Sequence, residues 1–393
     1  MEVRPGYKQT EVGVIPEEWA WKRLGDVASV GSGGTPSREQ AAYWGGSIPW
    51  ITTSQIDFGV IAEAEQFITE EGLKNSAAKL LPPGTLLMAL YGQGKTRGKV
   101  GVLGIPAATN QACASIALQA GVSREFIFHF LANQYEVIRN ASNSGSQENL
   151  NGYIVRGIPV VFPSPPEQRA IATALSDVDA LLSTLDRLIA KKRDLKQAAM
   201  QQLLTGQTRL PGFEGEWEVK RLGDLLTICH GKSQHEVEVD DGAYPILATG
   251  GQIGTAKRPL YDKPSVLIGR KGTINQPQYM DTPFWTVDTL FYSAMKEDNS
   301  ARFLYYRFCL IDWMQYNEAS GVPSLNARTI ESIEVHCPGP VEQEVIAKIL
   351  SDMDAELAVL ETRREKTRLL KQGMMQELLT GKTRLITPEP TDA

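Results

Sequence analysis

Two long segments of the chain carry apolar residues at alternating steps of four and three, which is the pattern of a helix with one buried stripe. The first stripe runs from Ile171 to Ile189 and the second from Ile346 to Leu360. Steps that average 3.5 residues are typical of helices that pack on each other in a coiled coil. The pattern therefore predicts two helices whose seam residues are Ile171, Leu175, Val178, Leu182, Leu185 and Ile189 in the first and Ile346, Leu350, Met353, Leu357 and Leu360 in the second.

Both stripes are followed by basic residues, after which the apolar positions shift to a new line. We expect this line to hold Leu195, Ala199 and Leu203 in the first helix and Leu370, Met374 and Leu378 in the second. A capping box with proline in the first turn begins the first segment at Ser164, and Gly206 and Gly381 are stop signals. A helix of about 39 residues is roughly 58 Å long.

The two helical segments are copies of one another. Residues 166–210 match residues 341–385 at a constant offset of 175 without a gap, so that Glu167 corresponds to Glu342. A second repeat precedes each copy: residues 18–33 resemble residues 216–231 at an offset of 198. The chain is therefore a variable block followed by a helical block, used twice. Two equal helices most simply pack antiparallel, which gives a pseudo-two-fold, nearly circular layout.

The variable blocks have the pattern of β-rich domains, in which short apolar runs are bounded by glycine and proline. Each block also has one predicted helix near its end, over 124–139 and 301–316. The fold class is therefore α+β, with globular blocks over 1–163 and 207–338, helical blocks over 164–206 and 339–385, and a tail over 386–393. The predicted strands include residues 48–51, 85–90, 100–103, 115–118, 265–268 and 291–294.

Composition narrows the class of protein. At 393 residues, more than one domain is expected. No apolar run approaches the ~20 residues that span a bilayer, and the N-terminal residues lack the apolar core of a signal peptide. Four cysteines lie far apart, which fits free thiols in a reducing cytoplasm: Cys113, Cys229, Cys309 and Cys337. A cytoplasmic protein is therefore expected.

The sequence offers weak catalytic candidates. It contains no P-loop and no dinucleotide-binding glycine motif. Glu216, Glu218 and Lys220 resemble part of a nuclease cluster, but the equivalent positions of the first copy do not repeat it. His230 and His235 near Cys229 are too few and too irregularly spaced for a zinc site. We expect no catalytic residues, no metal and no cofactor in this chain.

Positive charge is segregated, although the net charge is −6. Residues 72–124 contain no acid, and residues 243–280 contain only Asp262. Each of these stretches has a glycine-rich basic loop: the first, over 91–99, lies between two predicted strands, and the second, over 268–272, lies at the corresponding place in the second block. Such loops suit phosphate contacts and the reading of base edges, although solvated surface loops would look similar. The predicted DNA-binding residues are Gln93, Lys95, Thr96, Arg97, Lys99, Lys257, Arg258, Arg270 and Lys271.

The arrangement resembles the specificity subunit of type I restriction–modification systems over essentially the whole chain. The resemblance rests on the duplicated WxxxRLGD motif that begins at Trp19, on the duplicated helical block that begins PEQRAIATALSDVDALL at Pro166, and on opening phrases such as Ile48-Pro49-Trp50-Ile51. It implies a non-catalytic subunit for phage defence. Its two target recognition domains would read the halves of a split, asymmetric site in double-stranded DNA.

The same resemblance implies the partners. The two helices would act as a ruler for the spacer and as a scaffold for two methyltransferase subunits, to which motor–nuclease subunits can join. The complex would use S-adenosylmethionine, ATP and Mg²⁺, none of them bound by this chain. The alternative hypothesis is a coiled-coil adaptor with two protein-binding domains, which would show no affinity for DNA.

Overall fold

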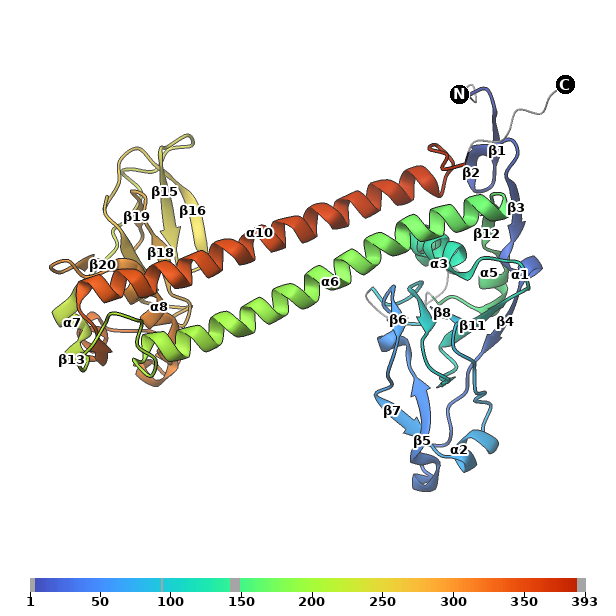
Figure 1. Cartoon of the computed structure of the whole chain (residues 1–393), viewed down its shortest axis with the longest axis horizontal. Coiled ribbons are helices and arrows are strands. Elements are labelled where there is room, and N and C mark those ends of the chain that lie inside the picture. The colour runs from blue at the N-terminus through green and yellow to red at the C-terminus, as the bar shows by residue number, and fades with distance from the viewer. Residues whose placement is uncertain (1–3, 93–94, 142–148, 387–393) are drawn as a thin grey trace. The chain divides into compact units, whose positions relative to one another are not determined.

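The computed structural model describes residues 4–92, 95–141 and 149–386. It divides into two compact units. Unit 1 comprises the residues up to Thr184 and those from Arg364 onward, and unit 2 comprises Leu185–Arg363. Two long helices contribute to both units: α6 spans Pro165–Leu204 and α10 spans Pro340–Leu378 (Figure 1). Their lengths of 40 and 39 residues confirm the predicted helices.

Unit 1 is built on a five-stranded sheet in the order β4-β11-β8-β9-β6 and a three-stranded sheet in the order β10-β5-β7. A small sheet pairs β12 with β3, and an N-terminal hairpin pairs β1 with β2. The strands are β1 Tyr7–Thr10, β2 Gly13–Pro16, β3 Ala20–Arg23, β4 Ala28–Ser32, β5 Trp44–Ile51, β6 Val60–Ile61, β7 Gln66–Ile68, β8 Leu86–Ala89, β9 Val100–Leu103, β10 Ala108–Thr109, β11 Cys113–Leu118 and β12 Pro159–Phe162. The shorter helices are α1 Leu24–Val27, α2 Glu70–Lys74, α3 Arg124–Asn133, α4 Tyr135–Asn140 and α5 Gly152–Gly157.

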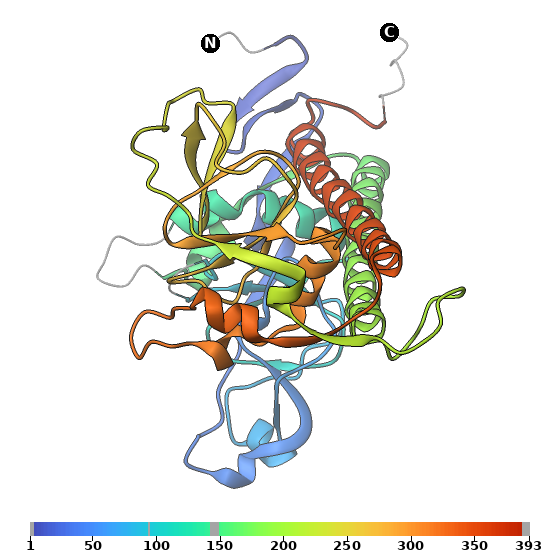
Figure 2. The ribbon, with the colours of Figure 1, turned by 90° about the vertical axis from the view of Figure 1, so that its left-hand side faces the viewer.

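Unit 2 repeats this plan with fewer strands (Figure 2, yellow and orange). Its larger sheet has the order β14-β20-β17-β18, which corresponds to β4-β11-β8-β9, and its smaller sheet has the order β16-β15-β19. The strands are β13 Glu218–Arg221, β14 Leu226–Cys229, β15 Tyr244–Ala248, β16 Gly251–Ala256, β17 Ser265–Gly269, β18 Gln278–Met280, β19 Trp285–Thr286, β20 Leu290–Met295 and β21 Glu334–Cys337. The shorter helices are α7 Leu222–Leu225, α8 Ala301–Leu310 and α9 Ala327–Ser332.

The apolar runs of the sequence form the centres of the sheets. Every residue of β8 and of β17 is buried, because each strand is covered on both faces. The two strands lie at equivalent places in the larger sheets, next to β11 and β20. The six predicted strand segments all fall on observed strands, and the α+β class is confirmed.

The helix predicted over 124–139 is wrong in one respect, because it is divided into α3 and α4 at Gln134. The helix predicted over 301–316 is divided as well, since Ile311 is extended and only a 3₁₀ turn, Trp313–Tyr316, follows α8. This second break lets Trp313 turn into the core, where it is 1% exposed and its indole N–H donates to the carbonyl of Phe308 at 2.8 Å. Burial of the largest side chain outweighs continuation of the helix.

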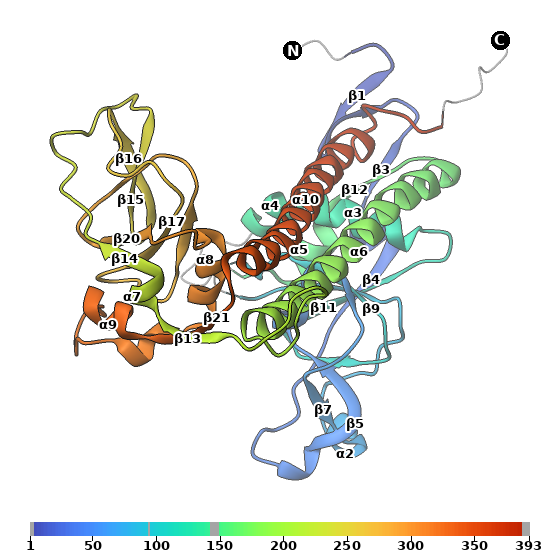
Figure 3. The ribbon, with the colours of Figure 1, turned by 60° about the vertical axis from the view of Figure 1, so that its left-hand side comes forward.

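The long helices pack antiparallel inside each unit (Figure 3). In unit 1 Lys371 of α10 contacts Asp179 of α6 at 2.6 Å, and in unit 2 Lys192 of α6 contacts Glu356 of α10 at 2.7 Å. Within each unit the start of one helix packs beside the end of the other. In unit 1 Leu175 shares a core with Leu378.

The seam residues differ in burial. Ile171, Leu175, Leu185, Ile189, Ile346, Leu350 and Leu357 are buried, whereas Val178, Leu182, Met353 and Leu360 are half-buried. The shifted line is wrong at its first position, because Leu195 and Leu370 are 48% and 59% exposed. The neighbouring Lys196 and Lys371 turn inward instead and form ion pairs across the helix pair.

Candidate nucleic-acid interface

The two basic loops occupy the same place in the two units. The first joins β8 to β9 and the second joins β17 to β18, and these hairpins are equivalent in the two sheets. In each unit the loop residues face a segment that precedes a short helix. The backbone N–H of Leu150 donates to Leu90 in unit 1, and that of Leu325 donates to Arg270 in unit 2, both at 2.9 Å. The duplicated framework therefore presents both loops in the same way.

The predicted DNA-binding residues of the first loop differ in their exposure to solvent. Lys95 is exposed, Thr96 is half-buried and Arg97 is buried, with 8% of its surface exposed. Lys99 pairs with Asp57 at 2.7 Å and lies 5.8 Å from the centre of the Phe58 ring. Gln93 lies outside the described residues.

The backbone of this loop is fixed at its base. The hydroxyl of Tyr135 on α4 donates to the carbonyl of Lys95 at 2.6 Å. The N–H of Gly98 donates to Ala89 at 2.8 Å, and the φ of +85° at Gly98 is one that glycine adopts without strain. Among the described residues of this loop, Lys95 is a cation that is exposed to solvent.

The second loop is held on both sides by backbone hydrogen bonds. The N–H groups of Arg270 and Lys271 donate to Thr289, and that of Gly272 donates to Pro323. The guanidinium of Arg270 is half-buried and pairs with Asp288 at 2.6 Å, while Lys271 is exposed. Two other predicted contacts, Lys257 and Arg258, are exposed just after β16.

A cavity of about 650 Å³ lies beside the second loop, within unit 2. Its wall combines hydrogen-bond donors and acceptors with apolar groups. The cations Arg270 and Lys271 face the same space as the carboxylates of Asp288 and Glu318. The remaining wall comes from His230, Thr289, Phe291, Ala319, Val322, Ser324, Leu325, Asn326 and Ala327. Such a mixed lining can distinguish base edges by their donor and acceptor pattern.

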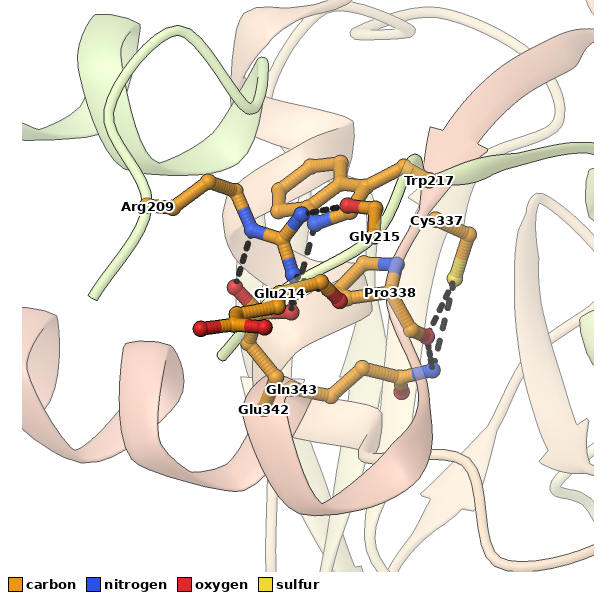
Figure 4. Close-up of polar contacts among 8 residues, drawn as sticks. All are labelled: Arg209, Glu214, Gly215, Trp217, Cys337, Pro338, Glu342 and Gln343. Atoms are coloured by element: carbon orange, nitrogen blue, oxygen red, sulfur yellow. Dashed lines mark hydrogen bonds and ion pairs between the residues drawn. The ribbon is translucent and has the colours of Figure 1, made fainter. Parts of the chain in front are cut away.

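Each unit also contains a buried clamp that joins the globular part to the helices. In unit 2 the carboxylate of Glu342, in the first turn of α10, accepts two hydrogen bonds of 2.8 Å from the guanidinium of Arg209 and one of 3.3 Å from the indole of Trp217 (Figure 4). Arg209 also donates to the carbonyl of Gly215. Glu342 is 4% exposed, so this bidentate pair is strongly shielded from water.

Unit 1 repeats the clamp with equivalent residues. Glu167, which is fully buried in the first turn of α6, accepts from Arg384 at 2.5 and 2.7 Å and from the indole of Trp19 at 3.1 Å. Glu18 also pairs with Arg384. These hydrogen bonds, above all those to Glu167, raise the pKa of the guanidinium above its usual value. The segment after each long helix is thus fastened to the start of the other.

A second duplicated contact fixes the aromatic helix of each unit. In unit 2 Asp354 of α10 pairs with Lys196 of α6 and accepts from the hydroxyl of Tyr306 on α8 at 2.6 Å. In unit 1 the equivalent Asp179 pairs with Lys371 and lies 3.9 Å from His129 on α3. Both clamps and both of these clusters were missed by sequence reasoning, although the constant offset of 175 marks their carboxylates.

Two of the weak catalytic candidates of the sequence pair with each other. Glu218 and Lys220 form an ion pair at 2.9 Å on β13. Burial raises the pKa of Cys113 to about 12 and that of Cys337 to about 11, which keeps both thiols protonated near neutral pH. Within the described ranges, no three histidine, cysteine, aspartate or glutamate side chains come together as metal ligands. In the same ranges no helix is long and apolar enough to cross a membrane.

Comparison with known families supports these observations. A family model described as "Type I restriction modification DNA specificity domain" matches residues 16–192 and 214–369. The type I restriction enzyme MjaIX specificity subunit of Methanocaldococcus jannaschii is 24% identical over 429 residues, which cover 96% of each chain. The EcoR124I/EcoR124II specificity subunit of Escherichia coli is 26% identical over 186 residues, or 46% of each chain.

Solved structures show the same fold. The crystal structure of a type I restriction–modification S subunit from M. genitalium superposes with a TM-score of 0.67 at 16% sequence identity, over 96% of this chain and 98% of that one. A chain from a study of complex assembly and conformational transition in a type I restriction–modification system superposes with a TM-score of 0.55 over 94% of this chain. The architecture is therefore shared along nearly the whole length.

Proposed function

Because the chain belongs to the type I restriction–modification DNA specificity family, we propose that it is the sequence-reading subunit of such a complex, and that each unit reads one half of a bipartite target in double-stranded DNA. One observation carries the proposal. Two equivalent hairpins, β8–β9 and β17–β18, present basic loops of different sequence on one framework. A shared frame with divergent loops suits two half-sites that differ, so the target is asymmetric.

The chemistry of the loops supports contact with nucleic acid. Lys95 and Lys271 are exposed cations that can approach phosphates, and Arg270 has the planar fork that recognises guanine in the major groove. The ion pair with Asp288 holds the guanidinium group of Arg270 in one orientation before DNA binds. Lys257 and Arg258 add exposed charge in the same unit.

The two long helices suit a scaffold. Their sequences repeat while the globular parts diverge, as expected if they face the same partner twice. We propose that they set the distance between the half-sites and dock two methyltransferase subunits, through which motor–nuclease subunits join. We place catalysis, with S-adenosylmethionine, ATP and Mg²⁺, on those partners in the cytoplasm and no cofactor on this chain.

The test uses the full chain assembled with its methyltransferase subunits. We expect it to select a bipartite sequence from a randomised DNA library, with an affinity that falls steeply as salt rises, because each phosphate contact releases counterions. Arg270→Ala should relax selection in one half-site only, by roughly tenfold at one base pair. Lys263→Ala removes an exposed cation of the same unit that does not line the cavity, and should leave the preference unchanged.

The adaptor hypothesis makes the opposite prediction. If the assembled complex bound random and selected DNA equally, and without dependence on salt, DNA reading would be excluded. The globular parts would then be protein-binding domains.

A further inference from the structure

A surface loop with internal hydrogen bonds forms the second wall of the cavity beside Arg270. It spans residues 317–324 and is closed by a single side chain. The amide oxygen of Asn317 accepts from the N–H groups of Ala319 and Ser324 at 3.1 and 2.9 Å, and its amide nitrogen donates to Ala319 at 2.8 Å. The N–H of Glu318 donates to Ser324 at 3.0 Å. The loop is therefore organised before any ligand binds.

The loop is continuous with the basic loop through the backbone. Ser324 forms a β-bridge with Lys271, the N–H of Gly272 donates to Pro323 at 2.8 Å, and the N–H of Leu325 donates to Arg270 at 2.9 Å. A shift of one loop would break these hydrogen bonds. The two loops thus present their side chains to the cavity as one surface.

Glu318 is the acceptor that this loop brings to the cavity. Its side chain is exposed, and the hydroxyl of Thr329 on α9 donates to it and so orients the carboxylate. Arg270 and Lys271 line the same 650 Å³ space and offset the repulsion that a carboxylate would meet beside phosphates. A carboxylate can only accept hydrogen bonds, and the amino group of cytosine is the major-groove donor that Glu and Asp side chains recognise.

We propose that Glu318 is a specificity-determining residue of unit 2, which accepts a hydrogen bond from the exocyclic amino group of a cytosine while Arg270 donates to a guanine of the same half-site. Thr329 is a positioning residue, because it acts on DNA only through Glu318. This inference rests on the proposed DNA-reading function. It adds which base the second half-site requires and which side chain reads it.

The experiment compares Glu318→Gln with the wild-type chain, each assembled with its methyltransferase subunits, by selection from a randomised DNA library. In Glu318→Gln the amide oxygen can accept the bond from Thr329, which leaves the amide NH2 group where the second carboxylate oxygen was. That group is a donor, so it repels the amino group of cytosine and suits N7 of adenine. We expect the preference for cytosine at one position of one half-site to fall by roughly tenfold or more. Thr329→Val should weaken the preference at that same position without changing the base.

The other half-site is the internal control. Because unit 1 is unaltered, its half-site must be selected by Glu318→Gln as in the wild type, which shows that the complex is assembled. Unchanged selection at the other positions of the second half-site shows that unit 2 is folded. Glu236→Gln changes an exposed glutamate away from the cavity and should leave both half-sites intact. If Glu318→Gln selects the wild-type sequence with equal strength, or if the altered position is not a cytosine, Glu318 is not this reader. If the wild-type complex selects no sequence, the proposed function itself fails.

Discussion

Glu342 is the residue on which three segments of unit 2 depend. It lies in the first turn of α10, binds Arg209 from the segment after α6, and accepts a hydrogen bond from Trp217 just before β13. A buried carboxylate is tolerated only when its charge is matched and its lone pairs are filled. The guanidinium of Arg209 matches the charge of Glu342, and the guanidinium and the indole of Trp217 together donate hydrogen bonds to its oxygens.

Glu342→Gln should therefore lower the free energy of unfolding of unit 2 by about 2 kcal/mol or more, because Arg209 would keep a charge with no partner. Urea unfolding followed by tryptophan fluorescence measures the loss. Glu344→Gln, an exposed change two residues away, should have little effect.

A double variant at Glu342 and Arg209 distinguishes the effect of an unpaired charge from the effect of lost packing. Glu342→Leu combined with Arg209→Met removes both charges, so we expect it to be less destabilised than Glu342→Leu alone. Strictly additive losses in the two single variants and the double variant would mean that the clamp contributes no coupling energy.

Sequence reasoning found these residues only in part. The repeat aligns Glu167 with Glu342, but each carboxylate binds an arginine and a tryptophan that lie more than a hundred residues away in the chain. Periodicity reports which face of a helix is buried, and it carries no information on such distant partners. Likewise the basic loops could be located from charge, whereas the burial of Arg97 depends on tertiary packing.

At the scale of elements, α3 is fastened to the long helices in unit 1 through His129. This imidazole is 2% exposed, and its Nε2 lies 3.2 Å from the hydroxyl of Ser176. Its Nδ1 makes no hydrogen bond to any residue that the structure describes. Burial and the nearby Lys371 lower its pKa from 6.5 to about 4, against the opposing charges of Asp179 and Glu125. His129 is therefore neutral in the folded protein, and its contact with Asp179 is not an ion pair at neutral pH.

The attachment of α3 should weaken in acid. Between pH 6.5 and about 4 the unfolded chain protonates this histidine and the folded chain does not, so stability falls as the pH is lowered through this window. The shift corresponds to about 3 kcal/mol at the acid end. His129→Gln cannot titrate, and it should lose less stability than the wild type between pH 6.5 and 4, as measured by urea unfolding at each pH.

His235→Gln is the matched control, because His235 is exposed in unit 2. It should follow the wild-type profile, which also contains the titration of carboxylates. If the free energy of unfolding of the wild type and of His129→Gln changed in parallel with pH, His129 would take up no proton on unfolding.

Elements with a strong period were predictable and their interruptions were not. The long helices and the buried strands follow from local pattern, since a stripe or an apolar run records burial directly. The local pattern does not mark the breaks at Gln134 and Ile311, and the second break accompanies the burial of Trp313. Leu195 and Leu370 are exposed, and the lysines beside them pair with carboxylates across the helix pair. These ion pairs join residues that lie far apart in the chain, and the periodic pattern of a single helix carries no information on them.

At the scale of the whole molecule the chain is one framework used twice. The clamps show this physically, since the segment after α6 binds the start of α10 and the segment after α10 binds the start of α6. The order and the duplication of the blocks are visible in the sequence, so the layout of two globular blocks and two helical blocks could be predicted from it. The two basic loops differ in sequence and have no such redundancy, so the roles proposed for their residues rest on geometry.

The proposed ruler role of the helices can be tested by lengthening them. Four residues inserted after Leu188 add about 6 Å to α6, close to the rise of two base pairs, and rotate the remainder of the helix by about 40°. Thr362 of α10 lies opposite Leu188 in the register set by Lys196 and Asp354, so a second insertion after Thr362 restores the pairing. We expect the single insertion to weaken binding or alter the spacer.

The double insertion should select both original half-sites with a spacer one or two base pairs longer, because the recognition loops are untouched. Sequencing of selected DNA reads the half-sites and the spacer in one measurement. An unchanged spacer in the double insertion would assign the distance to the globular parts, and a changed half-site would mean that the helices take part in reading bases. The proposal that the helices set the spacer length and the loops read the bases therefore requires a longer spacer between unchanged half-sites.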